Sequence, residues 1–297
     1  MIRLEHLAVA HATLVFGELQ DPALYTFIAD QQPASLEALQ TRYQRYLTAA
    51  PAGERWRNWL VFDGDHPVGH VQATVRDRRA DVAWLVFARY WRRGYGTAAV
   101  RALLAALPRE VVACEASIDP RNVASLALAN RVGFVHAGVR EDGDVVLSRP
   151  GREPDEIVAA WRATIAIADD DERGAAKCDL VPHVAALARI DPRGVQILAD
   201  ALGDRDGYSF PDPHSPQADN VGRVAADALG GFGELAEPIF AARLADPDRD
   251  TRERAVLGLE RLPALAPATI DALARRPEHD RDVRRAIDRV LARLSAR

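Results

Sequence analysis

The chain has very little lysine and cysteine and no long apolar run. Lys177 is the only lysine among 38 Lys and Arg residues, and the two cysteines, Cys114 and Cys178, lie far apart. This spacing does not indicate a disulfide framework, and no cluster of Cys and His has metal-ligand spacing. The absence of 18 consecutive apolar residues and of a charged-then-apolar leader indicates neither a membrane span nor export. We therefore expect a cytoplasmic protein without a metal site.

The composition changes near residue 150, and 297 residues are enough for two ordinary domains. Residues 1–150 alternate short apolar runs with helical patterns and carry 17 Lys and Arg against 16 Asp and Glu, a net charge of +1. Residues 151–297 lack strand patterns and carry 21 against 27, a net charge of −6. We predict an α+β domain over 1–150 and an all-α domain over 151–297. The acidic second half disfavours nucleic-acid binding.

The most informative segment, residues 90–98, places Gly94 and Gly96 where a helix should begin. Apolar residues recur downstream at helical spacing, and residues 82–87 upstream predict a buried strand. The first N–H groups of a helix lack partners inside it, and glycines let a phosphate approach them closely. The segment therefore predicts a pyrophosphate-binding loop, although glycines at a helix start can also simply make a turn. The dinucleotide fingerprint is excluded because Ala99 stands where its third glycine should be. The phosphate loop that ends in Gly-Lys-Ser/Thr is excluded because residues 90–98 contain no lysine.

A second motif consists of Asn122, Ser125 and the pair Gly133-Phe134. Asn122 can cap a helix, and Ser125 lies about one turn further on the same side. By themselves, these residues would only begin and end a helix. Together and in this order, the two motifs resemble those of the GNAT acyltransferases, whose loop usually reads Gln/Arg-x-x-Gly-x-Gly/Ala. Trp91 occupies the Gln/Arg position, as in the branch similar to ribosomal-protein alanine N-acetyltransferases.

The resemblance covers residues 1 to about 150 and implies a GNAT fold, a mixed and mostly antiparallel twisted sheet flanked by helices. It also implies acetyl-CoA (coenzyme A) as the cofactor. The residues that it implies in cofactor binding are Leu85, Val86, Phe87, Arg92, Arg93, Gly94, Tyr95, Gly96, Thr97, Ala98, Asn122 and Ser125.

Further elements fit the same arrangement. Residues 21–27 and a segment capped by Ser35 and running to about Leu47 resemble the two helices near the acceptor site. Residues 59–62 and 68–75, joined by an Asp-Gly-Asp turn, predict a hairpin. Residues 111–116 and 144–147 predict two more strands.

The residues that transfer protons in many relatives are missing. Ala83 stands where a strand glutamate serves as base, and Ala129 where a tyrosine serves as acid. The available catalytic candidates are Glu115, His70 and Gln72, with Asp119 as a further carboxylate. Glu115 can equally face solvent, and His70 can simply be a packed strand histidine. Water-relayed deprotonation, or positioning of an already neutral amine, would need no dedicated residue.

The second half repeats a helical pattern with a spacing of 30 and 31 residues between Ala225, Ala255 and Ala286. This period predicts stacked helix pairs and resembles short HEAT repeats, most closely at residues 279–286. An ordinary helical bundle is the alternative. We expect the arginines of the last helix to form a solvated face. The long loop 203–220 contains two aromatic residues and is predicted to be a contact surface, which could cover the acetyltransferase cleft.

The resemblance implies an acetyl-CoA-dependent N-acetyltransferase acting on a primary amine of a small molecule or of a protein N-terminus, by direct attack on the thioester. The alternative is a catalytically weak acyl-CoA-binding scaffold whose helical repeats recruit a protein partner. Neither hypothesis involves a membrane, and nucleic acid is disfavoured as a partner.

Overall fold

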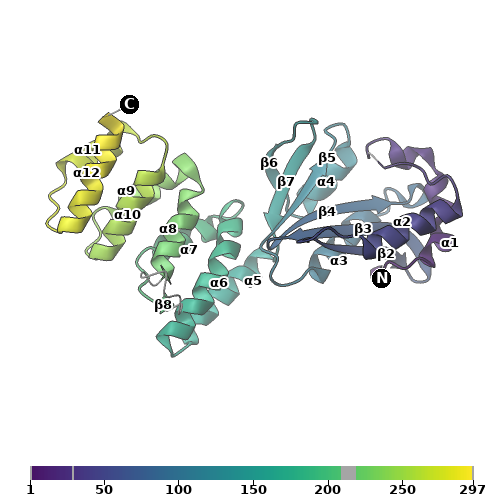
Figure 1. Ribbon diagram of the computed structural model, residues 1–297, viewed down its shortest axis with the longest axis horizontal. Helices are drawn as coiled ribbons and strands as arrows, with labels where there is room; N and C mark the ends of the chain where they lie inside the picture. The colour runs from purple at the N-terminus through teal and green to yellow at the C-terminus, as the bar shows by residue number, and fades with distance from the viewer. Residues whose placement is uncertain (1, 29, 209–218, 296–297) are drawn as a thin grey trace. The chain divides into compact units, whose positions relative to one another are not determined.

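A seven-stranded sheet forms the centre of the first unit (Figure 1). The structure is a computed structural model that describes residues 2–28, 30–208 and 219–295, and it divides the chain into compact units at residues 1–153 and 154–297. The strand order is β1-β2-β3-β4-β5-β7-β6; β4 and β5 are parallel, and the other neighbours are antiparallel. The strands are β1 (Ile2–His6), β2 (Arg55–Asp63), β3 (His66–Arg76), β4 (Arg79–Val86), β5 (Ala113–Ile118), β6 (Val135–Val139) and β7 (Val145–Pro150). The predicted mixed, mostly antiparallel sheet is confirmed.

Strand alternation decides which side chains each face of the sheet receives. In β3, Val71, Ala73 and Val75 are buried in a core shared with α3 (Tyr95–Ala106), whereas His70 and Gln72 line a cavity outside that core. α4 (Val123–Arg131) contributes to the same core as α3. A separate core joins α1 (His11–Val15), α2 (Leu36–Thr48) and the sheet. The sheet therefore lies between two helical layers.

The predicted helix over residues 21–27 is wrong. Residues Pro22–Tyr25 form the short 3-10 helix η2, because Asp21 caps them by accepting from Ala23 N–H at 2.9 Å and Thr26 N–H bonds back to Ala23. The helix predicted after Ser35 is confirmed: the Ser35 hydroxyl accepts from Ala38 N–H at 3.1 Å at the start of α2. The remaining short helices of this unit are η1 (Glu18–Gln20) and η3 (Ala88–Tyr90).

The second unit is built from helices. α6, α8, α10 and α12 pack against one another in succession, and α7, α9 and α11 pack beside them. No helix among the described residues is long and apolar enough to cross a bilayer. The helices are α5 (Pro154–Ala163), η4 (Thr164–Ala166), α6 (Asp170–Ala188), α7 (Pro192–Ala201), α8 (Val221–Gly230), η5 (Gly233–Ala236), α9 (Glu237–Arg243), α10 (Arg249–Arg261), α11 (Pro267–Arg275) and α12 (Arg281–Ser295).

This unit is not free of strands as predicted. β8 (Gly207–Tyr208) pairs with β9 (Asp219–Asn220), because the two ends of the long loop come together and bond to each other. Most of the loop predicted as a contact surface, residues 209–218, lies outside the described residues.

Helices α6, α8, α10 and α12 of the second unit start with the same kind of cap. An Asp or Asn side chain accepts the N–H three residues further on, which satisfies one free donor of the first turn. These capping residues are Asp169, Asn220, Asp248 and Asp280.

Two arginines near the start of a helix bond to the segment that leads to a later helix. Arg173 of α6 donates to Asp206, which lies between α7 and α8, and Arg252 of α10 donates to Glu278, which lies between α11 and α12. Each guanidinium also donates to the backbone carbonyl of the residue six positions earlier in the sequence. This recurrence supports a stack of similar helix pairs.

The arginines of α12 form an exposed face, as predicted, with the exception of Arg293, which is half-buried. Arg293 donates to the carbonyl of Leu262 at 2.8 Å, and Arg289 donates to Glu260 at 3.1 Å. Because α12 packs on α10, its arginine stems lie along the end of α10, where the last carbonyls have no helical partner.

Gly258 permits close contact between α9 and α10. A Cβ at this position would lie 2.4 Å from ring atoms of Phe240, which is fully buried. We expect Gly258→Ala to lower the free energy of unfolding by about 1–3 kcal/mol, because the ring must move within a packed core. Urea unfolding followed by far-UV circular dichroism measures this change.

The matched control is Gly230→Ala at the end of α8. There a Cβ would meet only the side chain of Arg261, at 3.9 Å. This variant should be neutral or slightly stabilising, since alanine favours the helix. Equal stability of the two variants would contradict the packing argument.

Candidate active site

The sheet opens between β4 and β5. Their pairing joins only residues 79–81 to residues 113–115. Beyond Asp81, β4 stays paired with β3 as far as Val86, while β5 continues along β7. The far edge of β4 therefore has no strand partner among the described residues, and its peptide groups are available for other bonds. Leu85, Val86 and Phe87 lie at the end of this open edge.

The glycine-rich segment turns sharply between β4 and α3. Arg92 and Gly94 have φ angles of 60° and 84°, and Gly94 is the N-cap of α3. The first bond within the helix joins Ala98 N–H to the Gly94 carbonyl at 3.2 Å, so the N–H groups of residues 95–97 have no helical partner. No side chain caps α3. With the exposed Arg92 and Arg93, these N–H groups form a site suited to an anion.

Two contacts hold the start of α3 in place. The Tyr95 hydroxyl donates to Asp63 at the end of β2, at 2.8 Å. A Cβ at Gly96 would lie 2.5 Å from the side chain of Leu128, so the glycine lets α3 and α4 approach closely. Gly96 thus has a packing role in addition to exposing backbone.

α4 begins beside the end of β5. Asn122 accepts from Ser125 N–H at 3.1 Å and caps the helix, which confirms the predicted cap. Arg131, at the other end of α4, donates to the Thr97 hydroxyl at 3.4 Å and so connects α4 to the first turn of α3. Both motifs singled out in the sequence therefore belong to one packed group of elements.

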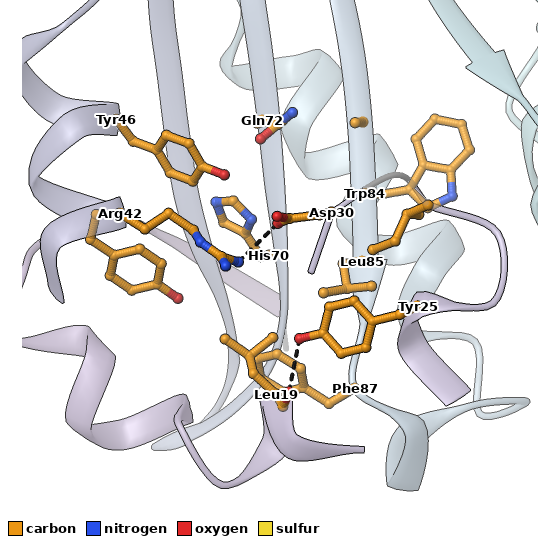
Figure 2. A pocket seen from close by; sticks show the side chains of 13 residues that line it. Leu19, Tyr25, Asp30, Arg42, Tyr46, His70, Gln72, Trp84, Leu85 and Phe87 are labelled. Atoms are coloured by element: carbon orange, nitrogen blue, oxygen red, sulfur yellow. Dashed lines mark hydrogen bonds and ion pairs between the residues drawn. The ribbon is translucent and has the colours of Figure 1, made fainter. Parts of the chain in front are cut away.

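A cavity of 260 Å³ lies on the α2 side of the open strand (Figure 2). β3 and β4 supply its floor, and α2 and the segment before it supply its walls. Its lining residues are Leu19, Tyr25, Ile28, Asp30, Arg42, Tyr43, Tyr46, His70, Gln72, Ala83, Trp84, Leu85 and Phe87.

One ion pair crosses the cavity. Arg42 of α2 donates to Asp30 at 3.0 Å, and Figure 2 shows the two charged groups meeting in front of His70. Arg42 also donates to the Gln31 carbonyl at 2.8 Å, which fixes its direction. Burial raises the pKa of the phenols of Tyr43 and Tyr46, so both stay protonated at neutral pH.

His70 is neutral in this environment. Burial lowers its pKa to about 4, while the nearby Asp30 carboxylate acts weakly in the opposite direction. Its Nε2 is buried and has no hydrogen-bond partner among the described residues. The imidazole can therefore accept a hydrogen bond or a proton, but with this pKa it is a weak base.

Comparison with known proteins finds a family model that matches most of the first unit. Residues 2–135 match the model of the acetyltransferase (GNAT) domain. The match lies within the first unit, whose sheet and flanking helices have the GNAT fold. No curated protein matches the chain.

Several solved structures are similar to half of the chain. An acetyltransferase from Thermus thermophilus is 22% identical, with 50% of this chain and 97% of that chain covered and a TM-score of 0.45. The aminoglycoside acetyltransferase AAC(6')-Ib in complex with coenzyme A is 20% identical, with 50% and 95% covered and a TM-score of 0.44. The ribosomal L7/L12 alpha-N-protein acetyltransferase RimL in complex with coenzyme A is 16% identical, with 50% and 93% covered and a TM-score of 0.46.

The first unit brings only two of the three catalytic candidates together. His70 and Gln72 line the cavity, but Glu115 lies where β4 and β5 are still paired, and its carboxylate contacts Arg79. Asp119 is also elsewhere: Arg121 binds it and lowers its pKa to about 2.

Sequence reasoning missed the polar residues of α2 and of the segment before it. Asp30, Arg42, Tyr43 and Tyr46 all line the cavity of the first unit. The spacing of Arg42, Tyr43 and Tyr46 within one predicted helix was a usable signal, because residues three and four apart share a face. No local pattern indicated Asp30.

His70 should make the stability of the first unit depend on pH. Its folded pKa of about 4 lies below the ordinary value of 6.5, so the unfolded state binds the proton more readily. This contribution to stability is fully present above pH 6.5 and is lost as the pH falls towards 4. The total loss is on the order of 3 kcal/mol. His70→Gln should remove this part of the pH dependence, which urea unfolding at several pH values would measure.

The control is His66→Gln at the exposed start of β3. It should retain the wild-type profile. Parallel profiles for His70→Gln and the wild type would show that His70 is not held neutral.

Proposed function

We propose that the protein is an acetyl-CoA-dependent N-acetyltransferase. The observation that carries the proposal is the junction at residues 85–87, where the open edge of β4, the start of the anion-binding turn and the cavity adjoin. An acyl donor and an acceptor amine need such a junction, because their reacting atoms must be held in contact. The family match supports acyl transfer in general, and the acceptor is part of our proposal.

The cofactor fits the residues present. The uncapped N–H groups of residues 95–97, with Arg92 and Arg93, would bind the pyrophosphate. The open edge of β4 would bind the pantetheine by its peptide groups, and Asn122 and Ser125 of α4 would lie along it. When bound, acetyl-CoA supplies the thioester carbon that the amine attacks.

The cavity residues would orient the amine. Gln72 and His70 offer hydrogen-bonding groups on the floor, and the protonated Tyr43 and Tyr46 offer donors on the wall. No carboxylate of β4 faces the amine, since Ala83 occupies that position. We infer that the amine is a primary amine of a small molecule or of a protein N-terminus, and that positioning and water account for most of the proton transfer.

One observation favours the alternative of a weakly catalytic acyl-CoA-binding scaffold. Ala83 and Ala129 stand where relatives place a base and an acid, and Ala129 is fully buried. In that case the stacked helices of the second unit, interpreted as HEAT-like repeats, would recruit a protein partner. The two hypotheses share cofactor binding and differ in turnover.

Acetyl-CoA binding tests both hypotheses. We expect acetyl-CoA at about 100 times its dissociation constant to raise the free energy of unfolding by roughly 2.7 kcal/mol. Arg93→Glu should weaken binding about tenfold at low salt, because an exposed cation beside the phosphates becomes an anion. Arg101→Glu, an exposed position further along α3, is the matched control and should bind normally. If the wild type shows no stabilisation, the proposed function is wrong.

Turnover separates the enzyme from the scaffold. We expect free thiol to be released from acetyl-CoA only when a suitable primary amine from a panel of small amines and peptides is present. Ala83→Glu places a carboxylate in the cavity opposite Gln72 and should raise kcat about tenfold by general-base assistance, whereas Ala83→Gln should not. Cofactor binding without thiol release across the whole panel would favour the scaffold.

A further inference from the structure

A second cavity of the first unit, of 240 Å³, lies where β1 leaves the sheet. β1 pairs with β2 only as far as His6 and Trp59, so residues 55–57 of β2 have no strand partner on that side among the described residues. The end of β1, the last turn of α2 and the start of β2 enclose the space. Its lining residues are His6, Leu7, Tyr46, Leu47, Arg55, Trp56, Arg57 and Asn58.

Arg57 brings a half-buried positive charge to this cavity. Its Nε is buried and has no hydrogen-bond partner, and no carboxylate among the described residues forms an ion pair with its guanidinium. A charge that is partly removed from water and left unpaired is unfavourable. A buried polar group without a partner in the chain is therefore a candidate for contact with a ligand.

The carboxylates near Arg57 in the fold or in the sequence are bound by other arginines. Arg55 donates to Glu110 at 2.9 Å, and Arg76 donates to Glu54 at 2.7 Å. The pKa of Glu110 is lowered mainly by its own backbone N–H and by Arg55, and least by Arg57. No carboxylate is among the residues that line the cavity. The space therefore holds one positive charge that no described side chain pairs with.

The other walls of the cavity are largely apolar. The rings of Tyr46 and Trp56 meet edge to face, with their centroids 6.4 Å apart, and 48% of Leu47 is exposed. A ligand with an aromatic body can pack against such surfaces. Tyr46 also lines the first cavity, so the two cavities share one wall.

The end of α2 opposes an anion in this place, because the carbonyl end of a helix carries about half a negative charge. Two bonds reduce this effect. Asn58 Nδ2 donates to the Tyr46 carbonyl at 3.5 Å, and Ala49 N–H donates to the Arg45 carbonyl at 3.0 Å. The full charge of Arg57 exceeds what remains, so the cavity favours a negative ligand.

We propose that this second cavity binds a small organic carboxylate with an aromatic body, held by the guanidinium of Arg57. A planar guanidinium binds a carboxylate through two parallel hydrogen bonds. One unpaired positive charge matches a monoanion, whereas a phosphate dianion would bring a second negative charge that Arg55, already paired with Glu110, does not meet. The proposal is independent of the proposed function, because it makes no use of acetyl-CoA.

Benzoate tests the site by titration calorimetry on the full chain at constant ionic strength. We expect the wild type to bind benzoate with a dissociation constant on the order of 1 mM, the range for so small a ligand. Benzyl alcohol has the ring without the charge and should bind at least about tenfold more weakly. Phenyl phosphate should bind no more tightly than benzoate.

Two variants remove the charge of Arg57. Arg57→Met retains an unbranched apolar stem, and Arg57→Gln retains a polar end. Both should weaken benzoate binding about tenfold or more and leave binding of benzyl alcohol within about twofold. Without ligand, Arg57→Met should be at least as stable to urea as the wild type, because it removes an unpaired charge. Arg101→Met, at an exposed position of α3, is the matched control and should bind benzoate normally.

Four results would overturn the proposal. The site is wrong if the wild type does not bind benzoate, or if both Arg57 variants bind it as tightly as the wild type. Charge recognition is wrong if benzyl alcohol binds as tightly as benzoate, and the carboxylate class is wrong if phenyl phosphate binds more tightly. A large loss of stability in both Arg57 variants would show that the arginine is structural. None of these results depends on acetyl-CoA, so they leave the proposed function untouched.

Discussion

The loss of a strand partner along β4 is the constraint on which the first unit depends. Backbone N–H and C=O groups inside a protein must find partners, and β5 supplies them only as far as Asp81. Beyond that point the edge of β4 has to be satisfied by a side chain, by solvent or by a ligand. Trp91 satisfies one carbonyl, and under the proposed function the remaining groups of this edge would bind the cofactor. The separation of two strands thus opens the edge that we propose for the cofactor, and the end of this edge, at Leu85 and Phe87, borders the cavity.

Local parts of the site could be predicted from the sequence, because the signals are local too. Gly94 adopts a left-handed conformation that favours glycine, and Ser35 and Asn122 cap helices with the N–H three residues further on. The cavity could be predicted only in part, since His70 and Gln72 meet Asp30 and Arg42 through tertiary packing. Propensity also failed at residues 21–27, where one 3-10 turn replaces the expected helix.

Two strand residues show most clearly why the site could not be predicted fully from the sequence. Glu115 and Gln72 are both polar residues on central strands, and strand alternation alone makes them equally good catalytic candidates. The register separates them: Gln72 faces Ala83 beside the cavity, whereas Glu115 faces Asp81 where the strands are still paired. In the second unit, the arginines of α12 are exposed as expected except Arg293, which bonds to the carbonyls of Leu259 and Leu262 at the end of α10. Register and helix stacking are set by the whole fold and not by neighbours in sequence.

The low pKa of His70 bears on how a cavity without a strong base can handle an amine. The burial that keeps this imidazole neutral acts on any cation that enters the same space, so it lowers the pKa of a bound ammonium group as well. The Asp30 carboxylate opposes this effect, but Arg42 neutralises it at 3.0 Å. An amine held between Gln72 and the tyrosines would therefore lose its proton more easily than in water. Under the proposed function desolvation would do part of the work of a base in this cavity, where Ala83 supplies no carboxylate.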